Sequence, residues 1–339
     1  MKSITNAKYS NLIKNIGQIL ALGRQQAYSA VNDVLIQAYW KIGRHIVVYE
    51  QENNMKAEYG SELLDRIAHD LRKKYGRGFS RSNVYTMRQF YLKCPKIQTL
   101  SGKLSWSHFV ELLGVTDDLA RGFYEKQCLR ESWSVRQLRR QINSMLFERL
   151  ALSKDKKGVM KLAAKGHIIK EAPDAVKDPY ILEFLGLSED YKHTEKELEQ
   201  KIIDNMQSFL LELGKGFSFV SRQYRISFGN KHFYIDLVFY NRILKCFVLI
   251  DLKIGAISHQ DIGQMNLYLN YFKKEEMIAG DNEPIGIVLG VEKHRILVEY
   301  ALGGISNKLF ASKYRLSLPD KRLLQKAVER VISNERGAR

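Results

Sequence analysis

Cysteine, proline and long apolar runs are all scarce in this chain of 339 residues. Its three cysteines, Cys94, Cys128 and Cys246, are far apart and form no Cys-x-x-Cys pair, which favours reduced thiols over a disulfide framework or a zinc site. No stretch reaches the roughly 18 consecutive apolar residues of a transmembrane helix, and the first residues lack the apolar core of a signal peptide. We therefore expect a cytoplasmic protein that does not enter a membrane.

Five prolines and the lack of any low-complexity tract leave little room for long disordered segments. Hydrophobic residues make up 45% and aromatic residues 11% of the chain, as in globular proteins. A chain of this length usually forms about two domains, each large enough to bury its own core. We therefore expect folded structure along nearly the whole chain.

Acidic residues are in deficit. The chain has 54 Lys and Arg residues against 37 Asp and Glu residues, which gives a net charge of +17. Residues 1–150 carry 24 basic against 13 acidic residues, and the remainder carries 30 against 24. Excess positive charge on both parts favours a polyanionic partner such as nucleic acid, although a basic balance also serves solubility.

Helical periodicity dominates the first part of the chain. Apolar residues recur at helical spacing in two stretches, and Ser80 is a natural N-cap for a further helix, which Pro95 would end. We expect an all-helical, basic domain over residues 1–150. Residues 151–178 are rich in Lys, Gly and Pro without clear periodicity, and we expect them to form a linker.

The remaining sequence predicts a domain of helices and strands over residues 179–325, followed by a C-terminal helix or tail over residues 326–339. Turn residues such as Gly229-Asn230 separate apolar, β-branched runs, which favours a meander of strands. The expected elements are helix 195–213, strands 219–228, 232–240 and 244–253, helix 258–272 and strand 285–289.

Three charged residues interrupt the apolar strands: Asp236 in the second, and Asp251 and Lys253 in the third. Burying an unpaired carboxylate costs several kcal/mol, so each needs a basic or metal partner. Residues two apart share a face of a strand, so Asp251 and Lys253 point the same way, and Asp236 joins them if the strands form a hairpin. Two carboxylates and a lysine on a rigid sheet can bind Mg²⁺ and activate a water for attack on phosphate.

This order of elements, with Asp236 and Asp251-x-Lys253 on neighbouring strands, resembles the PD-(D/E)XK nuclease superfamily. More narrowly, the chain resembles the YhcG-like bacterial proteins, which join a helical N-terminal domain to such a nuclease core. The resemblance implies a two-domain α+β/α/β fold with a restriction-endonuclease-like αβββαβ core. The narrower resemblance is carried by Tyr39-Trp-Lys-Ile-Gly-Arg, Gly78-Phe-Ser, Met87-Arg-Gln-Phe-Tyr, Trp106-Ser-His-Phe-Val-Glu-Leu-Leu, Lys177-Asp-Pro-Tyr-Ile-Leu-Glu-Phe-Leu-Gly-Leu and Leu211-Glu-Leu-Gly-Lys-Gly-Phe.

The resemblance also implies roles for the charged residues. Asp236 and Asp251 would hold Mg²⁺, with Mn²⁺ as an alternative, and Lys253 would hold the attacking water and offset phosphate charge. An exposed salt bridge is the structural alternative. The sequence departs from the superfamily name at Ile235, which replaces a proline without chemical role. It departs from the family's usual residue at Asp251, where glutamate is more frequent and the shorter side chain would change the position of the metal.

Two further helices contribute residues by resemblance. Glu199 lies at the edge of the apolar stripe of the first helix and would complete the metal site; a solvated helix face is the alternative. Gln264 and Tyr268 share a face of the following helix and match the QxxxY motif of some branches of the superfamily, where the pair orients the lysine or the scissile phosphate. Ordinary helix packing is the alternative for this pair.

In the first domain, a turn and helix rich in basic and amide side chains are typical of a DNA-recognition segment, and a second basic cluster follows later. A solvated basic face would have the same pattern. The residues expected to contact nucleic acid are Arg77, Arg81, Asn83, Arg88, Arg136, Arg139 and Arg140.

The sequence as a whole predicts a Mg²⁺-dependent nuclease, with DNA favoured over RNA because most of the superfamily cuts DNA. An RNase on the same scaffold is one alternative. A nucleic-acid-binding or assembly subunit without catalysis is another, and the helical domain could equally serve as a homodimer or protein-partner interface.

Overall fold

The computed structural model describes residues 6–52, 57–94, 103–188, 193–293 and 308–333. The chain divides into two compact units, the first formed by residues 1–121 and 132–138 and the second by residues 122–131 and 139–339. This division falls before the boundary expected at residue 150, because Arg140 and Arg149 are tied by ion pairs to Glu212 within the second unit. The expected helix end at Pro95 lies outside the described residues.

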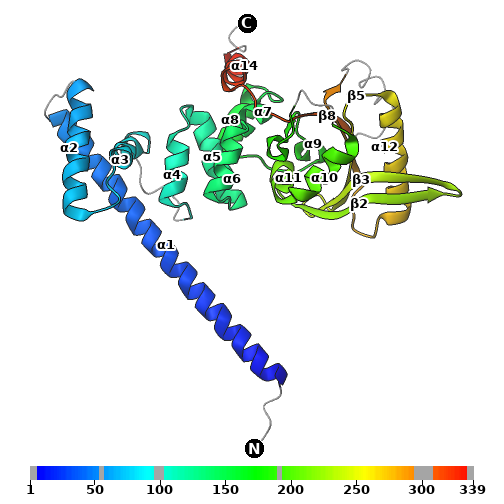
Figure 1. Ribbon diagram of the computed structural model, residues 1–339, viewed down its shortest axis with the longest axis horizontal. Coiled ribbons are helices and arrows are strands. Elements are labelled where there is room, and N and C mark those ends of the chain that lie inside the picture. Colours follow the sequence, from blue (N-terminus) through cyan, green and yellow to red (C-terminus); the bar gives the residue numbers. More distant parts are fainter. Residues whose placement is uncertain (1–5, 53–56, 95–102, 189–192, 294–307, 334–339) are drawn as a thin grey trace, which may run out of the picture. The chain divides into compact units, whose positions relative to one another are not determined.

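The first unit is helical. Gly43 allows its long first helix to pack closely on the third, because a Cβ atom at Gly43 would lie 2.0 Å from the backbone oxygen of Met87. Ser80 caps the third helix by accepting a hydrogen bond from Asn83 N, as the sequence predicted. The helices are α1 (Asn6–Glu52), α2 (Ala57–Tyr75), α3 (Arg81–Lys93) and α4 (Trp106–Leu113), with α5 (Asp118–Glu131) and α6 (Val135–Asn143) shared between the units (Figure 1).

The segment expected to be a linker, residues 151–178, contains two helices of the second unit, α8 (Lys156–Lys165) and α9 (Ala172–Ala175). Asp155 accepts a hydrogen bond from Gly158 N and so starts a helix that buries Val159 and Leu162. Lysines on its exposed side obscured the apolar periodicity. The helices of this unit are α7 (Leu146–Ala151), α8 (Lys156–Lys165), α9 (Ala172–Ala175), α10 (Glu195–Asp204), α11 (Met206–Leu213), α12 (His259–Tyr271) and α14 (Lys321–Ser333), with short helical turns at Glu183–Leu185 and Phe272–Glu276.

A six-stranded mixed sheet of order β1-β8-β6-β4-β3-β2 forms the centre of this unit. Strand β3 is antiparallel to both β2 and β4, whereas β4, β6, β8 and β1 run parallel to one another. The bounds are β1 (Tyr180–Ile181), β2 (Phe217–Phe228), β3 (Lys231–Asn241), β4 (Cys246–Leu252), β6 (Ile285–Gly290) and β8 (Leu309–Arg315), and a separate pair is formed by β5 (Ala256–Ile257) and β7 (Glu292–Lys293).

Two apolar clusters cover the two faces of the sheet. Helices α10 and α11 pack on one face, where Ile202 and Phe209 meet Phe239 and Ile250. Helix α12 packs on the other face, where the long β2–β3 hairpin crosses it (Figure 1). The helical first part and the mixed-sheet core confirm the predicted fold class.

The predicted helix over residues 195–213 is two helices in the structure. Asn205 interrupts it with φ −116° and ψ 30°. This residue is both the C-cap of α10 and the N-cap of α11. The apolar stripe continues across the break, so periodicity alone could not reveal it. No helix in the described part of the chain has the length and apolar character required to span a bilayer.

Candidate active site

Strand β4 positions the first two site residues at its end. Asp251 lies opposite Val288 of the parallel strand β6 and is 2% exposed, while Lys253 N donates to Leu289 O. Because the two side chains share a face, Lys253 Nζ lies 2.8 Å from Asp251 Oδ2. The predicted same-face arrangement of this pair is therefore present.

Strand β3 adds Asp236 through an irregular stretch of the β2–β3 hairpin. Strict alternation would put Ile235 and Leu237 on one face, yet Ile235 packs on the α12 side of the sheet and Leu237 on the α10–α11 side. Asp236 lies at this change of face, and its Oδ2 accepts a hydrogen bond of 2.7 Å from Leu252 N of β4. The carboxylate is thus fixed beside the Asp251–Lys253 pair.

Helix α10 supplies the third carboxylate. Glu199 is 7% exposed, and its Oε2 accepts a hydrogen bond of 2.6 Å from Gln223 Nε2 of β2. The same nitrogen donates to Asp236 Oδ1 at 3.0 Å. Gln223 therefore joins Glu199 to Asp236. It was absent from the predicted site because a glutamine among alternating polar strand residues gives no sequence signal.

Helix α12 brings the Gln264–Tyr268 pair to the same region. Gln264 Nε2 donates to the Tyr268 hydroxyl, which in turn donates to the backbone oxygen of Tyr234 at 3.1 Å. Burial raises the pKa of Tyr268 above its ordinary value, so the hydroxyl remains a donor at neutral pH. The pair thus anchors the strand segment that leads to Asp236.

Two acidic residues near Lys253 were also missed from the sequence. Asp261 Oδ1 and Glu195 Oε2 each lie 3.8 Å from Lys253 Nζ. Asp261 also accepts a hydrogen bond from Ser258 N as part of the cap that begins α12. Asp261 can therefore cap α12 and lie beside Lys253 at the same time, but only the capping role could be predicted from the sequence.

Burial and neighbouring charges perturb the titration of these groups. Burial, and secondly the nearby Asp236 carboxylate, raise the pKa of Asp251 to about 7 even though the Lys253 ammonium acts in the opposite direction. Burial alone would lower the pKa of Lys253, but the Asp251 carboxylate raises it above its ordinary value. Burial also raises the pKa of Glu199. Lys253 is therefore protonated at neutral pH, while Asp251 binds protons more tightly than an ordinary aspartate.

The oxygen donors at this site suit a hard divalent cation. Asp251 Oδ2 is buried and, although Lys253 Nζ is near, accepts no hydrogen bond of good geometry from the described residues. Glu199 and Asp236 add further carboxylate oxygens, the ligands that Mg²⁺ and Mn²⁺ prefer. Within the described ranges, no three His, Cys, Asp or Glu side chains are already arranged around one metal position. Gln223 donates hydrogen bonds to Glu199 and Asp236, and Lys253 forms an ion pair with Asp251, so these two side chains contact the carboxylates that a cation would require.

The basic residues proposed for nucleic-acid contact differ in their surroundings. Arg88 pairs with Glu50 at 2.7 Å, and Asn83 accepts from Trp106 Nε1 at 2.8 Å. Arg140 is held by Glu212 at 3.1 Å and by Glu183 at 3.0 Å. These three have internal structural contacts. The exposed residues of the set are Arg77, Arg81, Arg136 and Arg139, of which Arg81 pairs with Asp65.

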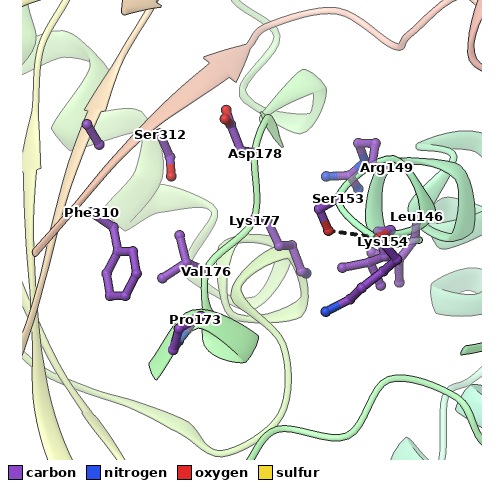
Figure 2. A pocket seen from close by; sticks show the side chains of 12 residues that line it. Leu146, Arg149, Ser153, Lys154, Pro173, Val176, Lys177, Asp178, Phe310 and Ser312 are labelled. Atoms are coloured by element: carbon purple, nitrogen blue, oxygen red, sulfur yellow. Dashed lines mark hydrogen bonds between the residues drawn. The ribbon is translucent and has the colours of Figure 1, made fainter. Parts of the chain in front are cut away.

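A separate pocket of about 340 Å³ in the second unit shares no lining residue with this site. Figure 2 shows Arg149 from α7, Lys177 and Asp178 from the segment after α9, and Phe310 from β8. Arg149 Nη1 lies 2.7 Å from Glu212 Oε1, and Lys177 Nζ donates to the backbone oxygen of Glu212. These cations serve the buried ion-pair cluster around Glu212, and we assign the pocket no function.

A mixed sheet with Asp236 in the middle of β3, Asp251 and Lys253 at the end of the neighbouring β4, and Glu199 on α10 has the arrangement of the PD-(D/E)XK class of nuclease folds. The family description "YhcG PDDEXK nuclease domain" matches residues 173–329, and "DUF1016 N-terminal domain" matches residues 15–149. Over 370 aligned positions, the chain is 38% identical to the Escherichia coli (strain K12) protein named "Putative nuclease YhcG", covering 99% of this chain and 98% of that protein. The chain therefore belongs to the YhcG family.

Two solved structures are similar to part of this chain. The repair endonuclease from Pyrococcus abyssi is 20% identical with a TM-score of 0.27, covering 39% of this chain and 50% of that one. The EndoMS–dsDNA2 complex gives 18% identity and a TM-score of 0.26, covering 40% of this chain and 51% of that one. This chain thus matches about half the length of each structure, and TM-scores of this size support no statement about substrate.

Proposed function

We propose that this protein is a divalent-metal-dependent nuclease that hydrolyses phosphodiester bonds in DNA. The observation that carries the proposal is the gathering of Glu199, Asp236, Asp251 and Lys253, from three different elements, at the end of β4. Membership of a nuclease family supports the reaction class. DNA is favoured over RNA by the usual substrate of the superfamily.

Asp236, Asp251 and Glu199 are the residues that would hold Mg²⁺ or Mn²⁺. The cation supplies a water of lowered pKa and stabilises charge on phosphate oxygens. Lys253, protonated next to Asp251, offsets the charge of the phosphate and orients the attacking water. Gln264 and Tyr268 hold the backbone at Tyr234 and so keep Asp236 in place, which makes them positioning residues.

A cleavage assay with matched variants tests the proposal. Wild type, Asp236→Asn, Asp251→Asn and Lys253→Met are incubated with plasmid, linear and branched DNA and with RNA, in Mg²⁺, Mn²⁺ or EDTA. We expect metal-dependent cleavage of DNA that falls by about 100-fold or more in each variant, since several kcal/mol of charge stabilisation is lost. Asp204→Asn, an exposed change on α10, is the control and keeps wild-type activity.

Three outcomes contradict parts of the proposal. Cleavage of RNA but not DNA would overturn the substrate. Cleavage that persists in EDTA would overturn the metal dependence. If no substrate is cut by any protein while nucleic acid is bound equally with and without metal, the chain is a binding or assembly subunit.

A further inference from the structure

Gln223 occupies the space between two carboxylates of the candidate site. Its Nε2 atom lies 2.6 Å from Glu199 Oε2 and 3.0 Å from Asp236 Oδ1, and donates a hydrogen bond to each. The other Asp236 oxygen is already held by Leu252 N. The end of the Gln223 side chain is therefore the point on which the available oxygens of both carboxylates converge.

The backbone at Gln223 is unusual in a way that serves this position. Gln223 lies opposite Asp236, between the paired residues Arg222–Leu237 and Tyr224–Ile235, and has φ +47°. Left-handed backbone costs a non-glycine residue about 1 kcal/mol or more and recurs at functional sites. The two strands change face at this pair, because Tyr224 packs on the α12 side whereas Arg222 Nη1 bonds Gln200 of α10. The strain thus directs Gln223 toward Glu199 and Asp236.

A primary amide can satisfy this position in two ways. Its NH₂ group suits two carboxylates that have no cation between them, because it donates two hydrogen bonds. Rotation about the Cγ–Cδ bond exchanges Nε2 with Oε1, and a neutral amide oxygen is an ordinary ligand for Mg²⁺, Mn²⁺ or Ca²⁺. Gln223 is exposed, so the rotation displaces no buried neighbour.

We propose that Gln223 is a metal ligand of this site, binding through Oε1 between Glu199 and Asp236. Without a cation, its NH₂ group donates a hydrogen bond to each carboxylate and so bridges the two. With a cation bound, the rotated amide would add a neutral oxygen from β2 to the carboxylates of Glu199, Asp236 and Asp251, without a further negative charge. This inference rests on the proposed metal-dependent function and assigns a ligand that the nuclease motif does not contain.

Metal binding by the full-length protein, without nucleic acid, tests this inference. Mn²⁺ affinity is measured by calorimetry, and the number of waters on bound Tb³⁺ is obtained from its luminescence lifetimes in H₂O and D₂O. Gln223→Met keeps the length of the side chain but removes its oxygen. We expect this variant to bind Mn²⁺ about tenfold more weakly and to hold Tb³⁺ with one additional water.

Two further variants separate the ligand from its surroundings. Gln223→Asn tolerates left-handed backbone at least as well as glutamine, yet its amide is one methylene shorter. We expect it to retain the thermal stability of the wild type but to bind Mn²⁺ as weakly as Gln223→Met. Gln200→Met changes another exposed glutamine, next to Glu199, and should leave affinity and hydration unchanged.

The outcomes distinguish this inference from the proposed function. If Gln223→Met binds Mn²⁺ as tightly as wild type or more tightly, with the same number of Tb³⁺ waters, Gln223 only separates the carboxylates and the inference is wrong. If wild type binds neither ion, or Asp236→Asn binds both as well as wild type, the metal site itself is absent and both proposals fall.

Discussion

At the scale of single residues, the buried carboxyl of Asp251 lowers the stability of the folded protein when it is ionised. Its carboxyl has a pKa of about 7 in the folded protein against an ordinary value of 3.8. The folded state therefore binds this proton more tightly than the unfolded state does. The stabilisation from that proton is complete below about pH 4 and is lost as pH rises toward 7.

Asp251→Asn should consequently stabilise the protein in EDTA. The variant removes the cost of burying a charge, so we expect an increase in unfolding free energy on the order of 2 kcal/mol at pH 8, declining toward zero near pH 4. Thermal unfolding of both proteins across this pH range measures the difference. A gain that is the same at every pH would show that packing, rather than ionisation, is responsible.

The opposite case is Glu212, a fully buried carboxylate that is ionised. Burial alone would raise its pKa, but Arg149 and Lys177 lower it to about 2. Glu212→Gln leaves the Arg149 and Lys177 charges buried without their counter-ion, and we expect a loss of about 3–5 kcal/mol in unfolding free energy. Urea denaturation measures it.

An exposed carboxylate provides the matched comparison. Glu283 pairs with Lys308 at 3.3 Å and also with Lys273, but its side chain is 40% exposed. Glu283→Gln should change stability by less than about 1 kcal/mol, because solvent screens exposed pairs. If Glu212→Gln and Glu283→Gln lose similar unfolding free energy, the ion-pair cluster around Glu212 contributes no more to stability than an exposed ion pair.

These residues also show which features of the site and of the buried ion-pair cluster were predictable from the sequence. Asp251 and Lys253 were evident from the sequence because charges are costly within an apolar strand. Gln223 and Glu212 were not, since the first depends on a change of face in the β2–β3 hairpin and the second lies in a helix whose other face looks solvated. Sequence patterns indicate which groups need a partner, whereas the partner depends on tertiary placement.

At the scale of elements, the crossing of α1 and α3 depends on Gly43. A methyl group there would meet the backbone oxygen of Met87, which cannot move without displacing α3. Gly43→Ala should therefore destabilise the first unit by about 2 kcal/mol. Gly17→Ala, in the same helix with open space around it, should stabilise by about 0.5–1 kcal/mol.

Hydrogen exchange followed by mass spectrometry localises these effects. Faster exchange in both α1 and α3 of Gly43→Ala, with α12 unchanged, is the expected pattern. Unchanged or slower exchange in α1 and α3 of that variant would show that the added methyl group is accommodated without loss of stability, which contradicts the prediction. The closeness of this crossing was not predictable from periodicity, although Gly43 lies in one of the segments that carried the family resemblance.

Strand boundaries were predicted more accurately than helix continuity. The expected strand 285–289 is Ile285–Gly290 in the structure, and the expected helix 258–272 is His259–Tyr271. Turn residues mark strand ends locally. The break at Asn205 is different, because the apolar stripe on both sides faces the same sheet and continues through it.

At the scale of the whole molecule, the net charge of +17 makes nucleic-acid binding dependent on salt. If exposed arginines of the helical region contact phosphates, Arg77→Ala and Arg136→Ala should each reduce the slope of log Kd against log salt by about 1. Fluorescence anisotropy with labelled DNA in EDTA measures the slope. Arg140→Gln, which breaks an internal ion pair, should lower thermal stability instead.

Unchanged slopes in Arg77→Ala and Arg136→Ala would argue against DNA contact by these residues. The helical region would then be better explained as an interface with a second copy or another protein. The sequence alone could not decide between these roles, because a solvated basic face and a phosphate-binding face have the same residue pattern.

The position of β4 inside the sheet has a consequence for synthesis on the ribosome. Asp251 lies on a strand whose second neighbour, β6, is made only with residues 285–290, after the rest of the site has been translated. A nascent or truncated chain that ends before β6 contains every proposed catalytic residue but lacks the strand that completes their support. The activity proposed for this site should therefore appear late in translation, once residues 285–290 have joined the sheet.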